Sequence, residues 1–190
     1  MRTAPHHHRY TGTAIALHWI VAAAIIGAFT VGLVAVELAV SPLKLKLYSW
    51  HKWIGVSIAL LVVARIAWRL RFPAPALPPD MRRWKQHVAS GTHASLYILM
   101  LAVPVTGWLM SSASGFPVVY FGALTLPDLV AKDKALADTL KLLHYALNKT
   151  LLLLIVLHVA AALKHHVIDR DNILARMLPF LKPRAPRGET

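Results

Sequence analysis

The sequence predicts an all-α protein, an integral membrane four-helix bundle formed as a single membrane domain over residues 1–190. Three observations lead to this fold class. Hydrophobic residues make up 57% of the chain, and its mean hydropathy is +0.54. The apolar residues fall in four blocks, each long enough to cross a bilayer as a helix. Most Lys and Arg residues flank these blocks and do not interrupt them.

Each block is expected to form one transmembrane helix. The expected spans are 14–36, 50–70, 92–113 and 142–164. The first is longer than the core of a signal peptide, and the second ends at a Pro-rich connector that cannot continue a helix. Residues 165–190 are expected to form a C-terminal tail. Apolar and basic residues alternate over 169–182, so a short helix lying on the membrane surface is a second interpretation of this tail.

The distribution of basic residues predicts that both termini are cytoplasmic. Thirteen Lys and Arg residues lie in the N-terminal tail, the middle connector and the C-terminal flank, against seven in the other two connectors and the adjoining helix starts. Loops rich in Lys and Arg stay on the cytoplasmic side. Topology and lipid headgroups therefore account for the net charge of +13, and nucleic acid is not an expected partner.

Histidines inside the apolar segments are the main functional candidates. They are His18, His51, His144 and His158. An ionisable ring in lipid is costly and usually marks a functional site. The chain has no Cys, which excludes thiolate haem ligation, iron–sulfur clusters and Cys-type zinc sites. His144 and His158 are fourteen residues apart, which on a helix is about 21 Å of rise with a rotation of only about 40°.

The expected topology pairs these histidines by depth. His18 and His158 lie near the cytoplasmic face, and His51 and His144 lie near the opposite face. Two stacked bis-histidine sites suit two haems b, because a flat apolar macrocycle fits between helices and two neutral imidazoles ligate its iron. Zinc would need more ligands at each site. Each histidine taken alone is also compatible with a hydrogen-bonded packing role.

Three further residues near the cytoplasmic side have more than one interpretation. His93 lies at the depth of His18, so it is either a rival axial ligand or a hydrogen-bonding residue near a haem or a substrate. Arg65 either pairs with a haem propionate, reaches a quinone headgroup or extends to the membrane interface. His165 at the water boundary either contacts lipid headgroups or belongs to a proton or quinone site.

Two glycines are candidates for a close approach to the cofactor. Gly55 and Gly107 are small enough to let the edge of a macrocycle reach the backbone. Close packing of helices through small residues explains them equally well.

Together these motifs resemble the bacterial cytochrome b561 family of small di-haem membrane proteins, over nearly the whole chain. The motifs are ALHW at 16–19, HKWIG at 51–55, VAR at 63–65, VPVTG at 103–107 and LHVAAALKHH at 157–166. The resemblance implies haem ligation by His18 with His158 and by His51 with His144. It also implies electron exchange with ubiquinone in the bacterial inner (cytoplasmic) membrane. The cytochrome b subunit of nickel hydrogenases shares this helix plan but is usually longer.

The resemblance further implies an activity, because the best-understood relatives oxidise superoxide and reduce ubiquinone. The chain is then a superoxide oxidase, with quinone bound near Arg65, His93 or His165 and no catalytic side chain assigned. Lysines near the outer face would steer superoxide toward the outer haem. They include Lys44, Lys46, Lys52 and Lys134. The alternative is a membrane cytochrome b subunit that relays electrons between quinone and a soluble redox partner protein.

Overall fold

The computed structural model describes residues 9–75, 81–178 and 180–181. The remaining parts of the N-terminal tail, the Pro-rich connector and the C-terminal tail, with the charges counted on them, lie outside the described residues. The helices and strands are α1 Gly12–Glu37, α2 Pro42–Arg71, α3 Arg83–Ala113, β1 Val119–Tyr120, β2 Leu124–Thr125 and α4 Lys134–Lys164. A π-helical turn, η1 His165–Asp169, and a 3-10 turn, η2 Leu174–Arg176, follow.

α2, α3 and α4 begin eight or nine residues earlier than their apolar blocks predict. The first turn of α2 starts at Pro42, and the Ser41 side chain caps it by accepting a hydrogen bond from Lys44 N. The Asp133 carboxylate caps α4 in the same way by accepting from Leu136 N at 3.0 Å. Hydropathy therefore locates the part of each helix that suits lipid, whereas capping side chains decide where the helix starts.

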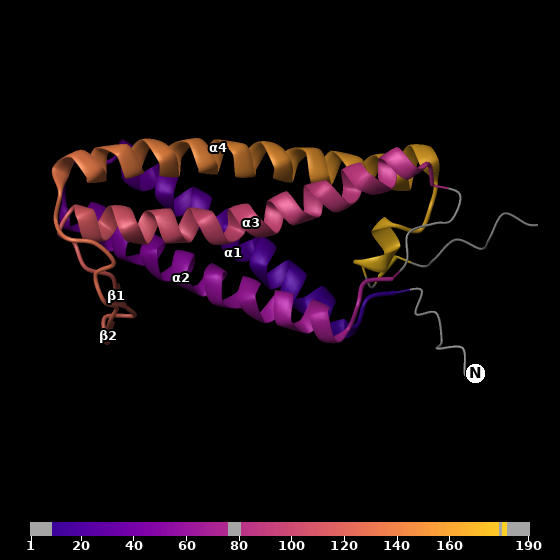
Figure 1. Ribbon diagram of the computed structural model, residues 1–190, viewed down its shortest axis with the longest axis horizontal. Coiled ribbons are helices and arrows are strands. Elements are labelled where there is room, and N and C mark those ends of the chain that lie inside the picture. The colour runs from indigo at the N-terminus through magenta and orange to yellow at the C-terminus, as the bar shows by residue number, and fades with distance from the viewer. Residues whose placement is uncertain (1–8, 76–80, 179, 182–190) are drawn as a thin grey trace, which may run out of the picture.

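The four helices form a bundle in which neighbours along the chain run in opposite directions (Figure 1). α1 packs against α2, α2 against α3, and α3 against α4. Every helix contributes to one buried apolar cluster. It consists of Val21, Ile25, Ile58, Val62, Leu96, Leu99, Met100 and Leu151. This cluster fixes the helices relative to one another between the two ends of the bundle.

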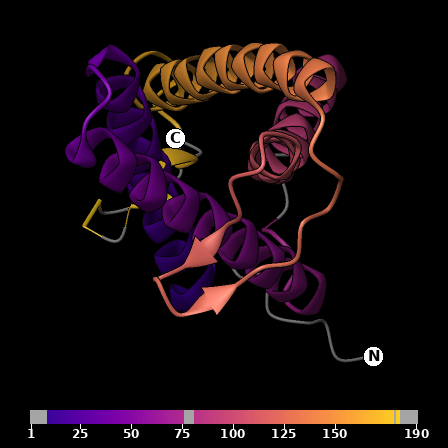
Figure 2. The ribbon, with the colours of Figure 1, turned by 90° about the vertical axis from the view of Figure 1, so that its left-hand side faces the viewer.

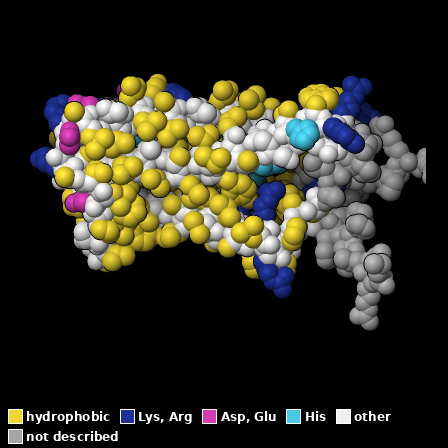
Figure 3. Space-filling model, viewed as in Figure 1, with side chains coloured by type: hydrophobic (Ala, Val, Ile, Leu, Met, Phe, Trp, Pro, Cys, Tyr) yellow, Lys and Arg dark blue, Asp and Glu magenta, His cyan; other side chains and the backbone are white. Residues whose placement is uncertain are grey.

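The outside of the bundle is also apolar. All four helices are long and apolar enough to cross a membrane, and only 6% of the most apolar window of α4 is buried inside the protein. Figure 3 shows hydrophobic side chains over the middle of the bundle and charged side chains toward its ends. The 26 residues of α1 span about 39 Å, more than the hydrocarbon core of about 30 Å. The predicted fold class is confirmed, and the chain is an integral membrane protein.

The two ends of the bundle differ. The hairpin end holds the ends of α1 and α3, the starts of α2 and α4, and the antiparallel pair β1–β2, which faces the viewer in Figure 2 and was not predicted. Trp53 Nε1 of α2 donates to Val119 O at 2.6 Å. Ser57 Oγ and the Tyr120 hydroxyl are hydrogen-bonded at 2.8 Å. These bonds hold the hairpin against α2.

The tail end holds the start of α1, the end of α2, the start of α3, the end of α4 and the described residues that follow α4. After η1 the chain turns back at Arg170, whose φ of 52° is left-handed. Over the described part of 169–182 only the end of η1 and the single turn η2 are helical, so the expectation of a surface helix is wrong. The segment is instead tied to α1, because Trp19 Nε1 donates to Met177 O at 2.9 Å and Arg9 donates to Leu181 O at 2.6 Å.

Candidate functional site

The four membrane histidines lie in two pairs, one toward each end of the bundle. At the hairpin end, the ring centres of His51 on α2 and His144 on α4 are 6.4 Å apart, with an angle of 83° between the ring planes. At the tail end, His18 on α1 and His158 on α4 are also 6.4 Å apart, at 64°. All four rings are half-buried. α4 therefore contributes one ring to each pair.

The spacing in both pairs fits two imidazoles on opposite sides of one metal ion. With a metal–nitrogen bond of about 2 Å and about 1.1 Å from ring nitrogen to ring centre, such rings have centres about 6.2 Å apart. His93 on α3 lies against the same pair, but its ring centre is 5.3 Å from that of His158. That distance is too short for a metal ion between them. His18 therefore has the spacing of a ligand opposite His158, and His93 does not.

Hydrogen bonds orient both rings at the hairpin end. His51 Nδ1 is 3.0 Å from Ala28 O, and His144 Nδ1 is 3.1 Å from Val103 O. A carbonyl oxygen only accepts, so each Nδ1 carries the hydrogen and each Nε2 keeps its lone pair. Histidines that bind metals usually donate their other N–H in this way. Both rings are thus in the tautomer that ligates through Nε2.

Two glycines leave room for these rings. A Cβ atom at Gly32 would lie 3.0 Å from His51 Cε1, and a Cβ atom at Gly107 would lie 3.1 Å from His144 Cε1. Gly55, singled out in the sequence, makes room for neither ring, because a Cβ atom there would meet nothing within 4 Å. Gly32 was not anticipated, because nothing in the sequence marks it as the glycine that faces His51.

Arg65 of α2 completes the site at the tail end. Its guanidinium nitrogen Nη2 is 2.9 Å from His18 Nδ1, and its Cζ is 5.3 Å from the centre of the Tyr97 ring. Arg65 therefore points toward the histidine pair and not toward the membrane interface. We call His18, His93, His158, Arg65 and Tyr97 the tail-end cluster.

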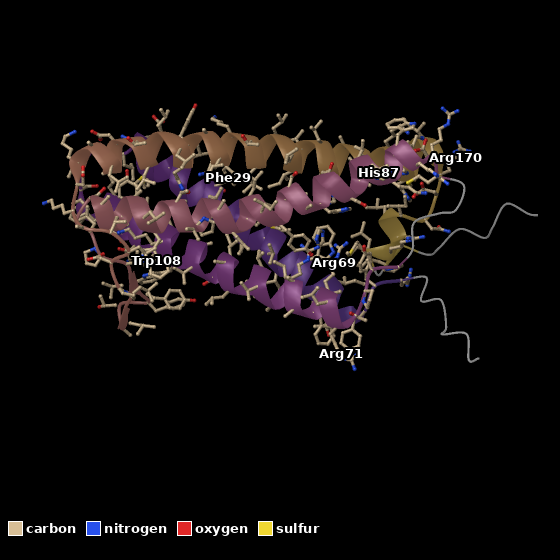
Figure 4. All side chains as sticks on the ribbon, viewed as in Figure 1. Phe29, Arg69, Arg71, His87, Trp108 and Arg170 are labelled. Atoms are coloured by element: carbon tan, nitrogen blue, oxygen red, sulfur yellow. The ribbon has the colours of Figure 1, made fainter. Side chains whose placement is uncertain are left out.

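A groove of about 600 Å³ opens beside this cluster, between α2 and α3. Its polar lining comes from Arg69, Ser90, His93 and Tyr97, and the rest of its lining is apolar. Figure 4 shows Arg69 between α2 and α3, and its Cζ is 5.8 Å from the centre of the Tyr97 ring. A mainly apolar groove with a few converging polar groups is typical of a small-molecule site.

His165 does not line this groove. Its Nδ1 is 2.6 Å from Asp171 Oδ2 and 3.3 Å from Asp169 Oδ2. Lys164 Nζ also contacts Asp169, at 2.7 Å. This charged network links the end of α4 to the returning tail. Of the three residues expected near quinone, the structure brings Arg65 and His93 into one cluster, whereas His165 contacts Asp169 and Asp171.

The four lysines expected to steer an anion all lie at the hairpin end, in the first part of α2 and at the start of α4. Lys134 is paired with Asp138 at 2.6 Å, which cancels much of its field. No carboxylate among the described residues lies within ion-pair distance of Lys44, Lys46 or Lys52. Of the four, these three therefore contribute more to a positive potential at this end than Lys134 does, although Asp128 acts on Lys52 from beyond ion-pair distance.

Comparison with known proteins assigns the chain to a family. A family model described as prokaryotic cytochrome b561 matches residues 9–180. The chain belongs to the prokaryotic cytochrome b561 family. It is 36% identical to cytochrome b561 homolog 2 of Escherichia coli K12 over 171 residues, which cover 90% of this chain and 91% of the relative. It is 33% identical to probable superoxide oxidase CybB of Yersinia pestis over 183 residues, covering 91% and 97%.

Family membership confirms the resemblance seen in the sequence and gives the class of cofactor. A cytochrome b561 carries b-type haem and transfers electrons in the membrane, between small-molecule redox substrates. The residues fit this group, because the half-buried imidazoles have the spacing of axial ligands and the chain has no thiolate to compete with them. This cytochrome b561 is therefore a membrane electron-transfer protein.

Proposed function

We propose that this cytochrome b561 holds two haems b and is a superoxide:ubiquinone oxidoreductase of the bacterial inner membrane. The hairpin end faces the periplasm, and the tail end, with both termini, faces the cytoplasm. The observation that carries the proposal is the pair of equal 6.4 Å spacings between histidines toward opposite ends of one bundle. Two such sites connect the two faces of the membrane, which a carrier working at one face would not need.

The ligands follow from these spacings. His51 and His144 hold the haem at the hairpin end, and His18 and His158 hold the haem at the tail end. When bound, haem b would supply one-electron redox chemistry at each of these sites. The helix rise between His144 and His158 separates the two sites by about 21 Å along α4.

The proposed reaction converts two superoxide ions, one ubiquinone and two protons into two molecules of O₂ and one ubiquinol. Each superoxide ion gives up one electron at the hairpin end without forming a bond to the protein. The positive charge of Lys44, Lys46 and Lys52 favours the approach of this anion. A relative of 33% identity is named probable superoxide oxidase, which supports this choice of substrate.

Ubiquinone takes up two electrons and two protons at the tail end. We place its headgroup in the groove between α2 and α3, beside the tail-end cluster. His93 and Arg69 line the groove and can hydrogen-bond to quinone oxygens, while the apolar lining suits the ring and its isoprenoid chain. His165, with Asp169 and Asp171 at the water boundary, is placed to exchange protons with the cytoplasm.

The direct test is the reduction of ubiquinone by an enzymatic superoxide generator, with the purified protein in liposomes. We expect ubiquinol to form faster than the spontaneous reaction allows, and superoxide dismutase should suppress it. A protein with two haems but no rate above the spontaneous one would reject the oxidase and favour a relay to a soluble partner. A protein with no haem, or with one haem, would reject both functions.

Filling the groove should separate quinone reduction from electron uptake. We expect Ala94→Trp, which places an indole in the groove, to slow ubiquinone reduction at least tenfold, while superoxide still reduces the haems. Rapid mixing with visible spectroscopy measures both steps. Ser95→Trp is the matched control, since Ser95 is the next small residue of α3, is exposed and does not line the groove. Equal effects of the two substitutions would contradict the placement of quinone.

Removing positive charge from the hairpin end should slow the capture of superoxide. Replacing Lys44, Lys46 and Lys52 together by Gln is expected to lower kcat/KM for superoxide by about tenfold at low salt. The difference should shrink as salt screens the field. The control is Lys134→Gln combined with Asp138→Asn, because removing both members of this ion pair leaves the net charge unchanged. If this double substitution had the larger effect, steering by Lys44, Lys46 and Lys52 would be wrong.

A further inference from the structure

The connector between α3 and α4 contains a long uncharged segment, residues 116–127, which we call the uncharged loop. It has no Asp, Glu, Lys, Arg or His, and most of its residues are apolar or aromatic. Phe116, Phe121 and Leu124 are exposed over 66%, 62% and 58% of their surface. Phe121 and Leu124 lie close together at the turn, because Tyr120 pairs with Leu124 across the hairpin. Exposed apolar side chains that lie close together mark a contact with another molecule or with a membrane.

The uncharged loop is fixed along the side of α2. Trp53 Nε1 donates to Val119 O at 2.6 Å, and Ser57 Oγ is 2.8 Å from the Tyr120 hydroxyl. The ring centres of Trp53 and Phe121 are 5.2 Å apart. Figure 1 shows the hairpin beside the first part of α2 and not beyond the end of the bundle. The loop therefore lies at the level of Trp53 and Ser57 along α2.

Two markers on α2 place this level inside the membrane. Counted from Arg71, the last residue of α2, the helix rises by about 27 Å to Trp53 and about 21 Å to Ser57, less than the hydrocarbon core of about 30 Å. Toward the other face, Lys46 Nζ lies 5.1 Å from the centre of the exposed Trp50 ring. Trp side chains are enriched at the membrane interface. Trp53 and Ser57 lie on the membrane side of Trp50.

The backbone of the loop limits how deep it can lie. A two-stranded sheet has two edges, whose N–H and C=O groups need partners that hydrocarbon cannot supply. The zone where acyl chains meet the headgroups supplies such partners and also takes up apolar and aromatic side chains. Its lack of charge and its level along α2 both fit this zone.

We propose that the uncharged loop inserts into the lipid leaflet at the hairpin end and anchors that end of the bundle. The exposed surfaces of Phe116, Phe121 and Leu124 contact lipid, which extends the apolar outside of the helices. The anchor also positions a cation, because Lys52 Nζ donates to Phe116 O at 3.2 Å. The inference depends on the fold and on the membrane span of α2, and not on the number of haems or on the substrate.

A fluorescent label on the loop tests the insertion. The chain has no Cys, so a single introduced Cys takes up the label alone. The haem-loaded Phe121→Cys protein, labelled with the environment-sensitive NBD fluorophore, is placed in phosphatidylcholine liposomes. We expect its emission to shift to shorter wavelength. Lipids with a nitroxide high on the acyl chain should quench most of it, whereas iodide on both sides of the bilayer should quench little.

Ala131→Cys is the matched control. Ala131 is exposed in the same connector, but it lies outside the uncharged loop and next to Lys132 and Asp133. Its label should emit at longer wavelength, be quenched by iodide and be affected little by the nitroxide lipids. Haem content per chain, measured for both variants, shows that the fold is retained.

Equal quenching of the two labels by iodide, at wild-type haem content, would overturn the insertion. A label at position 121 that is shielded from both iodide and the nitroxide lipids would place protein, such as a second copy of this chain, on the loop and would also overturn it. If Phe121→Cys loses haem, Leu124→Cys decides by the same criteria, because that substitution leaves the contact of Phe121 with Trp53 in place.

Discussion

Purified His144→Ala protein is expected to contain one haem b per chain instead of two. His144 provides one of the two rings at the hairpin end, 6.4 Å from the ring of His51. Without it, only one axial ligand remains, and Val103 O loses the N–H that it accepts. Pyridine haemochrome quantitation against protein mass gives the stoichiometry. The haem that remains should keep the low-spin spectrum of a bis-histidine site, because the tail-end pair is untouched.

The companion substitution should remove the other haem. His158→Ala is expected to lose the tail-end haem and keep the hairpin-end one, so the two single-haem proteins should differ in midpoint potential. His87→Ala is the control, because His87 is exposed on α3 (Figure 4). His93→Ala should retain two haems, since its ring is only 5.3 Å from that of His158. A haem lost from His93→Ala but kept in His18→Ala would show that the ligand opposite His158 is misassigned.

The pairing of histidines was accessible from the sequence because depth in a membrane follows from position along a helix. Each residue adds about 1.5 Å of rise whichever way the helix is rotated. Counting from the expected span ends therefore placed His18 level with His158, and His51 level with His144. The structure brings the same rings together, with centres 6.4 Å apart in each pair.

The rotation of each helix about its own axis cannot be predicted from this sequence. For this reason the sequence does not identify the residues that support the histidine rings. Whether Gly32 or Ala28 faces His51 depends on how α1 packs against its neighbours. That packing is set by a buried cluster drawn from all four helices. Whether the Arg65 side chain points toward a histidine or toward the membrane interface depends on the same rotation. One sequence carries no separate signal for it.

Short irregular elements were missed for a different reason. The hairpin of two-residue strands turns through Phe121 and Gly122, with φ of 50° and 72°. Gly122 is a common residue for such a turn, whereas Phe121 is not, so the sequence pattern is weak. The returning tail depends on contacts with Arg9 and Trp19, more than 150 residues away along the chain. Apolar and basic periodicity alone cannot detect such contacts.

Gly32→Val is expected to remove the haem at the hairpin end although it changes no ligand. A Cβ atom at position 32 would lie 3.0 Å from His51 Cε1 and 3.1 Å from His51 Nδ1, and valine adds two methyl groups beyond it. The ring must then move away, which breaks its 3.0 Å hydrogen bond to Ala28 O and its alignment with His144. Overpacking of this kind costs about 1–3 kcal/mol. Haem content per chain should fall toward one.

Gly27→Val separates this contact from the general effect of a β-branched residue in α1. Gly27 lies in the same helix, five residues earlier, and a Cβ atom there would meet nothing within 4 Å. Both substitutions change helix propensity equally, so Gly27→Val should keep two haems. Gly107→Val should reproduce the loss through His144, where the added Cβ would lie 3.1 Å from Cε1. If Gly27→Val lost the same haem as Gly32→Val, helix packing and not room for the imidazole would be the cause.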